Sequence, residues 1–199
     1  MTHGEHLKTI KFAIDKVNKR VPVIAGTGSN CTETAIMMSK EAASYGADAL
    51  LIVTPYYNKA TQKGLIAHYT AIAEAVPEIP VLLYNNPGRV GYTLSADLVE
   101  KLAHEVKNIV GMKDTSGDIT QTEEFIRRNA DVGFKVFGGK DTLLYASLCI
   151  GAVGGVCTAG NFMPELIVDI YNKYVAGDLK GSLAAQYKFC LLYTSDAAD

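Results

Sequence analysis

The sequence predicts an α/β fold built on a parallel β-sheet. Short runs of apolar and β-branched residues recur along the chain, amphipathic stretches separate them, and polar residues follow them. Strands that are apolar on both faces are typical of parallel sheets covered by helices. Two architectures fit this alternation, an open doubly wound sheet and a (β/α)₈ barrel that lacks two of its strands. The periodicity alone leaves both open.

Six runs are predicted to form the strands, with helices between them. The runs span residues 22–26, 48–54, 80–84, 109–113, 134–138 and 152–157. The stretch 6–17 carries apolar residues at helical spacing, with Ile10 and either Ala13 or Ile14 on the buried face. A second helix is expected to begin near Asn30, where Glu33 has the spacing of a capping box. Further helix starts are predicted at Ser95, Asp118 and Pro164.

Length and composition place the chain among ordinary globular domains. It has 199 residues, of which 48% are hydrophobic and 20% charged, and its formal net charge is −2. This balance gives no electrostatic case for nucleic acid or an anionic membrane, and no apolar run is long enough to span a bilayer. The four cysteines lack the spacing of a zinc site or a disulfide framework. We therefore expect free thiols and a reducing, cytoplasmic compartment.

Polar clusters follow five of the predicted strands. They lie at residues 26–30, 54–58, 84–89, 113–118 and 138–141. Because the carboxyl ends of parallel strands meet at one edge of a sheet, these clusters are expected to form the rim of one pocket.

Lys113 stands out on this rim. The alternation of a strand puts Ile109, Gly111 and Lys113 on one face, and it puts Val110 and Met112 under helices on the other. Lys113 then points into the barrel, and Gly111 leaves room for a ligand. Burial disfavours the ammonium form of a lysine, and a neutral amine attacks carbonyl groups. The competing interpretation is a strand-end lysine whose amine reaches solvent.

Two further residues fit carbonyl chemistry. By the same alternation Tyr84 points inward, where a phenol can relay protons beside an amine; alternatively, it is a core tyrosine. Arg89 follows in the next loop, and its guanidinium suits a carboxylate at a pocket mouth; alternatively, it is a solvated loop residue. The turn at residues 26–28 lacks the spacing of a dinucleotide or phosphate loop. The four histidines lack metal-ligand spacing, so no metal is expected.

These residues resemble a known family, the pyruvate-dependent class I aldolases of the dihydrodipicolinate synthase and N-acetylneuraminate lyase group. The similarity consists of five segments in the right order and runs from residue 1 to about residue 188. The segments are 25–28, 53–58, 83–91, 111–118 and 151–155. The resemblance implies a (β/α)₈ TIM barrel in which the six predicted strands are strands three to eight.

The resemblance also implies roles for individual residues. Lys113 matches the lysine that forms a Schiff base with pyruvate, so no separate cofactor is needed. Tyr84 matches the tyrosine that relays protons at that centre. Tyr57 matches the tyrosine that a neighbouring subunit inserts into the site, which implies a homodimer, usually within a homotetramer. Val156 and Gly139 match positions that line the pyruvate pocket.

Arg89 bears on the second substrate. It matches the arginine that holds the carboxylate of L-aspartate 4-semialdehyde, and the sialic-acid lyases generally lack it. The resemblance therefore favours condensation of pyruvate with L-aspartate 4-semialdehyde to 4-hydroxy-tetrahydrodipicolinate, in lysine and diaminopimelate biosynthesis. The alternatives are another pyruvate-dependent aldolase, N-acetylneuraminate lyase-like or acting on keto-deoxy sugar acids, and a barrel that has lost its chemistry.

Two departures from the family pattern concern completeness. The Gly-Thr-Thr-Gly-Glu segment of strand two is absent, and so are the C-terminal helices. We therefore expect a truncated fragment, with a partial barrel over residues 1–188 and a non-native or disordered tail at 189–199. Six strands cannot close a barrel, so this fragment alone is expected to be inactive and prone to aggregation.

Some family members bind lysine as a feedback inhibitor at the dimer interface. His3, His6, Asn30 and Tyr56 match positions of that site. Thr34 stands where an acidic residue would bind the lysine amine, and this replacement argues against feedback inhibition.

Overall fold

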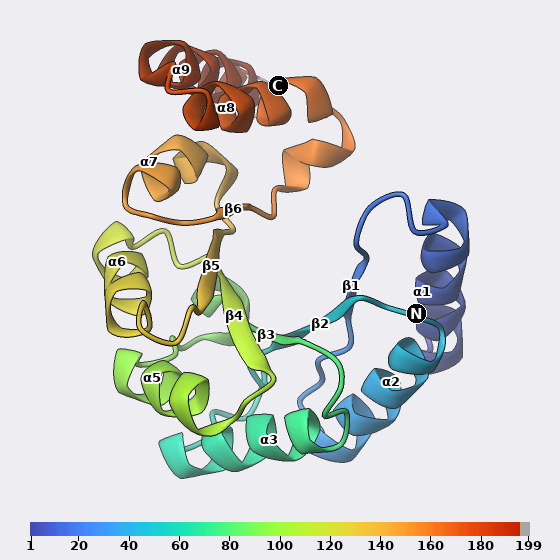
Figure 1. Cartoon of the computed structure of the whole chain (residues 1–199). Helices are drawn as coiled ribbons and strands as arrows, with labels where there is room; N and C mark the ends of the chain where they lie inside the picture. Colours follow the sequence, from blue (N-terminus) through green and yellow to red (C-terminus); the bar gives the residue numbers. More distant parts are fainter. Residues whose placement is uncertain (196–199) are drawn as a thin grey trace.

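The computed structural model describes residues 1–195 and contains one six-stranded parallel sheet (Figure 1). The strands are β1 (Ile24–Gly26), β2 (Ala49–Val53), β3 (Val81–Asn85), β4 (Ile109–Asp114), β5 (Lys135–Gly138) and β6 (Gly154–Gly155). All six predicted strands are present. Their order follows the chain without a reversal, and the sheet curls so that β1 and β6 lie at its edges. A doubly wound sheet reverses its order at a switch point, so this topology favours the barrel architecture.

Helices connect the strands and cover the outer side of the curled sheet (Figure 1). The α-helices are α1 (His3–Val17), α2 (Thr32–Ser44), α3 (Gln62–Glu74), α4 (Pro87–Val90), α5 (Ala96–Glu105), α6 (Ile119–Arg128), α7 (Leu144–Cys149), α8 (Pro164–Val175) and α9 (Leu179–Ser195). Two 3₁₀ turns follow β5 and β6, η1 (Asp141–Leu143) and η2 (Thr158–Asn161). Within residues 1–195, no helix combines the length and apolarity needed to cross a membrane.

Three helix starts follow the predicted signals. The Ser95 hydroxyl accepts a hydrogen bond from the Leu98 amide at 3.2 Å, which caps α5. The Asp118 carboxylate accepts one from the Gln121 amide at 3.1 Å, which caps α6. Pro164 lies in the first turn of α8, where its missing N–H has no helical acceptor to lose.

The predicted capping box at α2 is wrong. The helix begins at Thr32, and its N-cap residue, Cys31, makes no side-chain cap. The Cys31 amide instead donates a hydrogen bond to Ser29 Oγ, at 3.2 Å. Asn30 therefore does not cap the helix, because α2 begins two residues after it and Cys31 occupies the N-cap position.

A capping box does occur at α1, which begins three residues earlier than predicted. The Thr2 hydroxyl accepts from the Glu5 amide at 3.2 Å, and the Glu5 carboxylate accepts from the Thr2 amide at 2.7 Å. The buried residues of this helix are Ile10 and Ile14. Ile14 rather than Ala13 therefore occupies the inner face.

Two apolar clusters stabilise the fold. The larger cluster lies between the sheet and helices α1, α2, α3, α5 and α6, and its fully buried side chains include Leu50, Ile52, Tyr69, Leu83, Met112 and Phe125. The smaller cluster joins α7, η2, α8 and α9, and its buried members are Leu144, Leu148, Ala159, Ile170, Ala185 and Phe189. The helix α9 thus continues through the first part of the segment 189–199. Residues 196–199 lie outside the described residues, and a non-native tail stays a prediction.

The alternation along β4 departs from the prediction at one point. The pairing of β4 with β3 shifts there, so Val110 has no partner. Ile109 joins Met112 in the larger apolar cluster, whereas Val110 is 37% exposed. The prediction that Ile109 faces the barrel interior and Val110 faces the helices is therefore wrong, because a bulge reverses the alternation. Gly111 and Lys113 follow the bulge and keep the predicted face.

Candidate active site

Lys113 and Tyr84 form the centre of the candidate site. The register of β3 and β4 places Tyr84 beside Lys113, one residue before the carboxyl end of each strand. Lys113 Nζ lies over the Tyr84 ring, 4.4 Å from its centroid. Both side chains are half-buried, so the amine is neither enclosed in the core nor surrounded by solvent. The structure brings these two predicted residues together.

Because Gly139 has no side chain, the Lys113 side chain can occupy the space beside it. Its amide donates to the Asp114 carbonyl at 2.7 Å, which fixes the loop after β5 against β4. A Cβ atom at Gly139 would lie 2.9 Å from Lys113 Cε and would collide with Thr115 Oγ1. A larger residue at this position would displace the lysine.

Gly111 has a different role from the predicted one. A Cβ atom here would collide with the Lys135 carbonyl and would lie 2.9 Å from Leu82 Cδ2. The neighbouring strand and the Leu82 side chain therefore fill this space. Gly111 permits the close approach of β4 and β5, and it does not leave room for a ligand.

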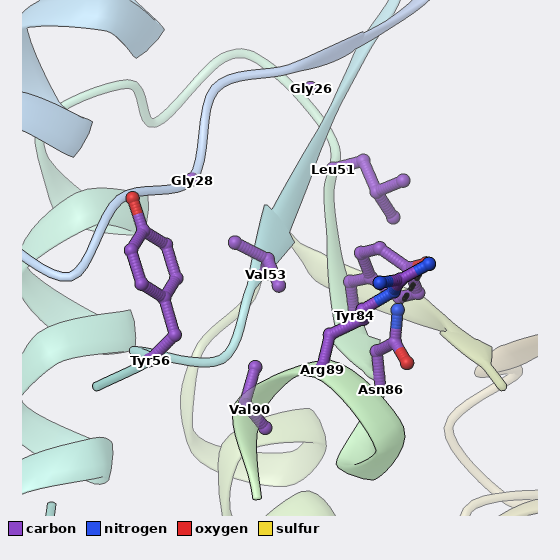
Figure 2. A pocket seen from close by; sticks show the side chains of 9 residues that line it. All are labelled: Gly26, Gly28, Leu51, Val53, Tyr56, Tyr84, Asn86, Arg89 and Val90. Atoms are coloured by element: carbon purple, nitrogen blue, oxygen red, sulfur yellow. Dashed lines mark hydrogen bonds between the residues drawn. The ribbon is translucent and has the colours of Figure 1, made fainter. Parts of the chain in front are cut away.

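A cavity of about 370 Å³ opens beside Tyr84 (Figure 2). It is lined by Gly26, Gly28, Leu51, Val53, Tyr56, Tyr84, Asn86, Arg89 and Val90. Tyr84, Asn86 and Arg89 lie on one side, and Tyr56 lies on the opposite side (Figure 2). Asn86 Nδ2 donates to the Tyr84 hydroxyl at 2.9 Å, which leaves the hydroxyl proton available for another acceptor.

Arg89 borders this cavity and a second one. The second cavity has a volume of about 470 Å³, and Thr115, Gly139 and Lys140 also line it. Arg89 lies on the short helix α4 and is exposed. It forms no ion pair with any residue of the described chain, so its guanidinium is available to an anion.

Tyr57 lies away from Lys113 within one chain. Its side chain is 96% exposed, and its backbone has a φ of +74°. A non-glycine residue is uncommon in this left-handed region. The predicted site is therefore not completed by Tyr57 from the same subunit.

Val156 lies at the end of β6, close to the other site residues. Its amide donates to the Gly138 carbonyl at 2.9 Å, and its side chain is half-buried. The pKa of the next residue, Cys157, is raised to about 12, mainly by burial and also by the Asp141 carboxylate, while Lys113 acts to lower it. A protonated thiol thus lies at this edge of the sheet at neutral pH.

The four residues predicted for a lysine site come from three separate elements. His3 and His6 lie on α1, Asn30 follows β1, and Tyr56 follows β2. All are exposed except His6, which is half-buried. Within residues 1–195 no hydrogen bond or ion pair joins their side chains. A lysine site formed by these four residues stays a prediction.

A buried polar network behind the site was missed by the sequence analysis. Asn85 and Asp114 are the last residues of β3 and β4, and they form the pair next to Tyr84 and Lys113. Asn85 Nδ2 donates to Asp114 Oδ1 at 2.8 Å, and Asp114 is only 4% exposed. The other donors to this pair are the Leu94 amide, the Ser116 amide and hydroxyl, the Thr93 hydroxyl and the Thr122 hydroxyl. The network fixes both strand ends to the loops that form the rim.

The sequence also did not predict two polar side chains that lie near Lys113. Asn86 holds the Tyr84 hydroxyl, and Thr115 Oγ1 is buried with no hydrogen-bond partner in the described chain. Both lie in the polar clusters after the strands, but asparagine and threonine are common in loops for other reasons. In the described residues, no group of three or more histidine, cysteine, aspartate or glutamate side chains could hold a metal ion.

The chain is similar to one protein family over nearly its whole length. A family model described as "Dihydrodipicolinate synthetase family" matches residues 1–195. A 4-hydroxy-tetrahydrodipicolinate synthase of Lachnoclostridium phytofermentans is 48% identical over 189 residues, which cover 95% of this chain. The chain spans 64% of the length of that relative.

Two solved structures match the fold over nearly the whole chain, at lower sequence identity. The 4-hydroxy-tetrahydrodipicolinate synthase of Methylacidiphilum fumariolicum SolV superposes with a TM-score of 0.95 at 33% identity, covering 100% of this chain and 66% of that one. The dihydrodipicolinate synthase of Acinetobacter baumannii, solved in complex with pyruvate, superposes with a TM-score of 0.92 at 41% identity. It covers 98% of this chain and 66% of that one.

Proposed function

Since the chain belongs to the dihydrodipicolinate synthetase family, we propose that it carries the Schiff-base lysine of a lyase that condenses pyruvate with L-aspartate 4-semialdehyde. The product is 4-hydroxy-tetrahydrodipicolinate, in lysine and diaminopimelate biosynthesis. The observation that carries the proposal is the position of Lys113 Nζ, 4.4 Å from the centroid of the Tyr84 ring at the carboxyl edge of a parallel sheet. This edge is where barrel enzymes place their catalytic groups.

In this proposal Lys113 supplies the nucleophile. Its uncharged amine attacks the ketone carbon of pyruvate, and loss of water from the resulting carbinolamine gives the Schiff base. Loss of a proton from the pyruvate methyl group then gives an enamine, which attacks the aldehyde carbon. The space beside Gly139 supports this role, because it lets the lysine side chain reach the rim without a clash.

Tyr84 is proposed to move the protons of these steps. The carbinolamine oxygen needs a proton to leave as water, and a phenol beside the amine can donate it. The bond from Asn86 Nδ2 to the Tyr84 oxygen supports this role, since it occupies a lone pair and leaves the O–H free to point elsewhere. Arg89 is proposed to hold the carboxylate of the aldehyde, and Val156 to line the pyruvate pocket.

Tyr57 is proposed to act in the site of a neighbouring subunit, within a homodimer or homotetramer. Two observations support this role. The side chain is 96% exposed, and the backbone is held in the left-handed region at φ +74°. An exposed aromatic residue in this conformation costs free energy in the isolated chain, and a partner surface that buries the ring would offset that cost.

Borohydride trapping tests the proposal, because it reports Schiff-base formation alone and not the whole condensation, which the fragment is expected not to complete. The full chain is incubated with pyruvate, reduced, digested and mapped by mass spectrometry. We expect one reduced pyruvate adduct, on Lys113, and none in Lys113→Met. In Tyr84→Phe, which keeps the ring under the amine, we expect adduct formation to slow by about 100-fold.

The control is Lys135→Met. It removes a lysine at the amino end of β5, away from the carboxyl edge of the sheet, and is expected to leave the adduct unchanged. Absence of any adduct in the wild-type chain, or an adduct that persists in Lys113→Met, would contradict the proposal. An unchanged rate in Tyr84→Phe would remove Tyr84 from the proton relay while leaving Lys113 in place.

A further inference from the structure

We propose that Lys140 is a second cation of the aldehyde subsite and that it selects aldehydes carrying a carboxylate. The inference rests on the proposed function and adds a residue to which neither the sequence patterns nor the family resemblance assigns a role. Its basis is the cavity of about 470 Å³ that Lys140 shares with Arg89. This cavity lies at the same rim as Lys113, because Thr115 and Gly139 line it and both adjoin the Lys113 side chain.

Two positive charges reach the cavity from different loops. Arg89 comes from α4, after β3, and Lys140 comes from the segment after β5. Neither side chain has an ion-pair or hydrogen-bond partner in residues 1–195. Two unpaired cations at one cavity repel each other, and an anion placed between them would relieve this repulsion and gain charge-assisted hydrogen bonds.

The backbone beneath Lys140 is shaped to receive it. Gly117 has a φ of +77°, and a Cβ atom there would lie 3.4 Å from Lys140 Cδ and 3.5 Å from its Nζ. The lysine side chain therefore lies against the loop after β4, while the residue as a whole is exposed. This contact holds the ammonium group at the rim of the cavity.

Asp141, the next residue along the chain, forms no ion pair with Lys140 or Arg89 in the described residues. Asp141 also lines the cavity, but its two carboxylate oxygens accept hydrogen bonds from the backbone amides of Thr158, at 3.1 Å, and Ala159, at 2.7 Å. Thr115 Oγ1 is buried in the same region and has no partner in the described residues. The cavity thus offers two cations to a bound molecule.

These groups define the chemistry of the ligand. A carboxylate can be held by the planar guanidinium of Arg89 on one side and by the point charge of Lys140 on the other. A neutral aldehyde would leave both cations unpaired and would bind more weakly. The subsite therefore favours a substrate with its carbonyl near Lys113 and a carboxylate at its far end.

Calorimetric titration of the full chain with succinate at low ionic strength tests the inference, with succinamide as the neutral analogue. We expect succinate to bind the wild-type chain at least about 10-fold more tightly than succinamide. Lys140→Met should weaken succinate binding by about 5- to 10-fold, while Lys140→Arg should stay within about twofold of the wild type. Lys135→Met, at the amino end of β5, should change nothing. Added salt should weaken binding to the wild type more than binding to Lys140→Met.

The inference is overturned if succinate does not bind, if succinamide binds equally well, or if Lys140→Met and Lys135→Met have the same effect. Borohydride trapping of pyruvate on the same samples separates this outcome from failure of the proposed function. A wild-type adduct on Lys113 together with unchanged succinate binding in Lys140→Met refutes only the role of Lys140. Absence of the adduct refutes the proposed function itself.

Discussion

Two histidines with opposite pKa shifts illustrate what single residues contribute. His68 on α3 is 6% exposed, its Nδ1 atom lies 2.8 Å from Thr32 Oγ1, and its Nε2 atom has no partner in the described chain. Burial lowers its pKa. His104 on α5 lies at the surface, where a hydrogen bond to the Asp131 carboxylate at 3.1 Å raises its pKa.

We predict that His68 makes the fold less stable as the pH falls below about 6.5, the pKa of an unperturbed histidine. Below this pH the unfolded chain accepts a proton on His68 more readily than the folded chain does. Protonation therefore stabilises the unfolded state relative to the folded state. The effect of His104 on folding stability has the opposite sign. The stability that His104 contributes is present below that pH and is lost as the pH rises through its pKa in the folded state.

Urea unfolding at several values between about pH 5 and 8 measures both effects. Below about pH 6.5, the free energy of unfolding should fall less steeply with decreasing pH in His68→Gln than in the wild type. In His104→Gln it should fall more steeply. If the acid-side slope is the same in His68→Gln and the wild type, the buried imidazole is not the group responsible.

The central pair of the site could be predicted at this scale, but its neighbours could not. The positions of Tyr84 and Lys113 depend only on the two-residue period of a strand, and both lie beyond the bulge at Val110. Asn86 and Thr115 lie in loops, where side-chain positions depend on contacts among β3, β4 and β5. No local period describes such contacts.

At the scale of elements, the ends of β3 and β4 depend on the pair Asn85 and Asp114. Asn85 is fully buried and also accepts from the Leu94 amide at 3.0 Å. Asp114 has no cationic partner in the described residues, so neutral donors alone satisfy its carboxylate. Removing one donor would leave a buried charge undersatisfied, which costs more than an ordinary hydrogen bond.

We predict that Asn85→Ala lowers the free energy of unfolding by about 2–4 kcal/mol, since it removes a donor to Asp114 and an acceptor for Leu94 at once. Urea denaturation measures the change. The matched control is Asn172→Ala on the exposed surface of α8, which should cost no more than about 0.5 kcal/mol. Equal losses in the two variants would show that the network does not stabilise the strand ends.

Elements were easier to predict than their boundaries. The strands were recognisable because burial on both faces makes each an apolar run. The start of α2 was not, because Cys31, which makes no side-chain cap, occupies the N-cap position in place of Asn30. The sequence also contains the capping box of Thr2 and Glu5 at the start of α1. It was not predicted, because the regularly spaced apolar residues that indicate a helix begin only after it.

At the scale of the whole molecule, strand order decides the architecture. Periodicity left a doubly wound sheet and a barrel open, since both alternate strands and helices. The order from β1 to β6 without a reversal depends on contacts between strands that are distant in sequence. The two apolar clusters likewise arise only when the helices pack. The smaller one meets the sheet at its edge, through β5 and β6. The edge strand β6 has only two residues and pairs with β5 alone among the described strands.

We predict that the segment from α7 to α9 opens without the rest of the fold. Its cluster has few fully buried side chains, and a short edge strand gives little resistance to local unfolding. Native-state hydrogen exchange followed by mass spectrometry should show faster exchange in α7 to α9 than in β2 to β4. Phe189→Ala, which removes a fully buried ring from the smaller cluster, should speed exchange in α7 to α9 and leave β2 to β4 unchanged. Equal loss of protection in both regions would mean that the chain unfolds as one cooperative unit, and that the two clusters are energetically one core.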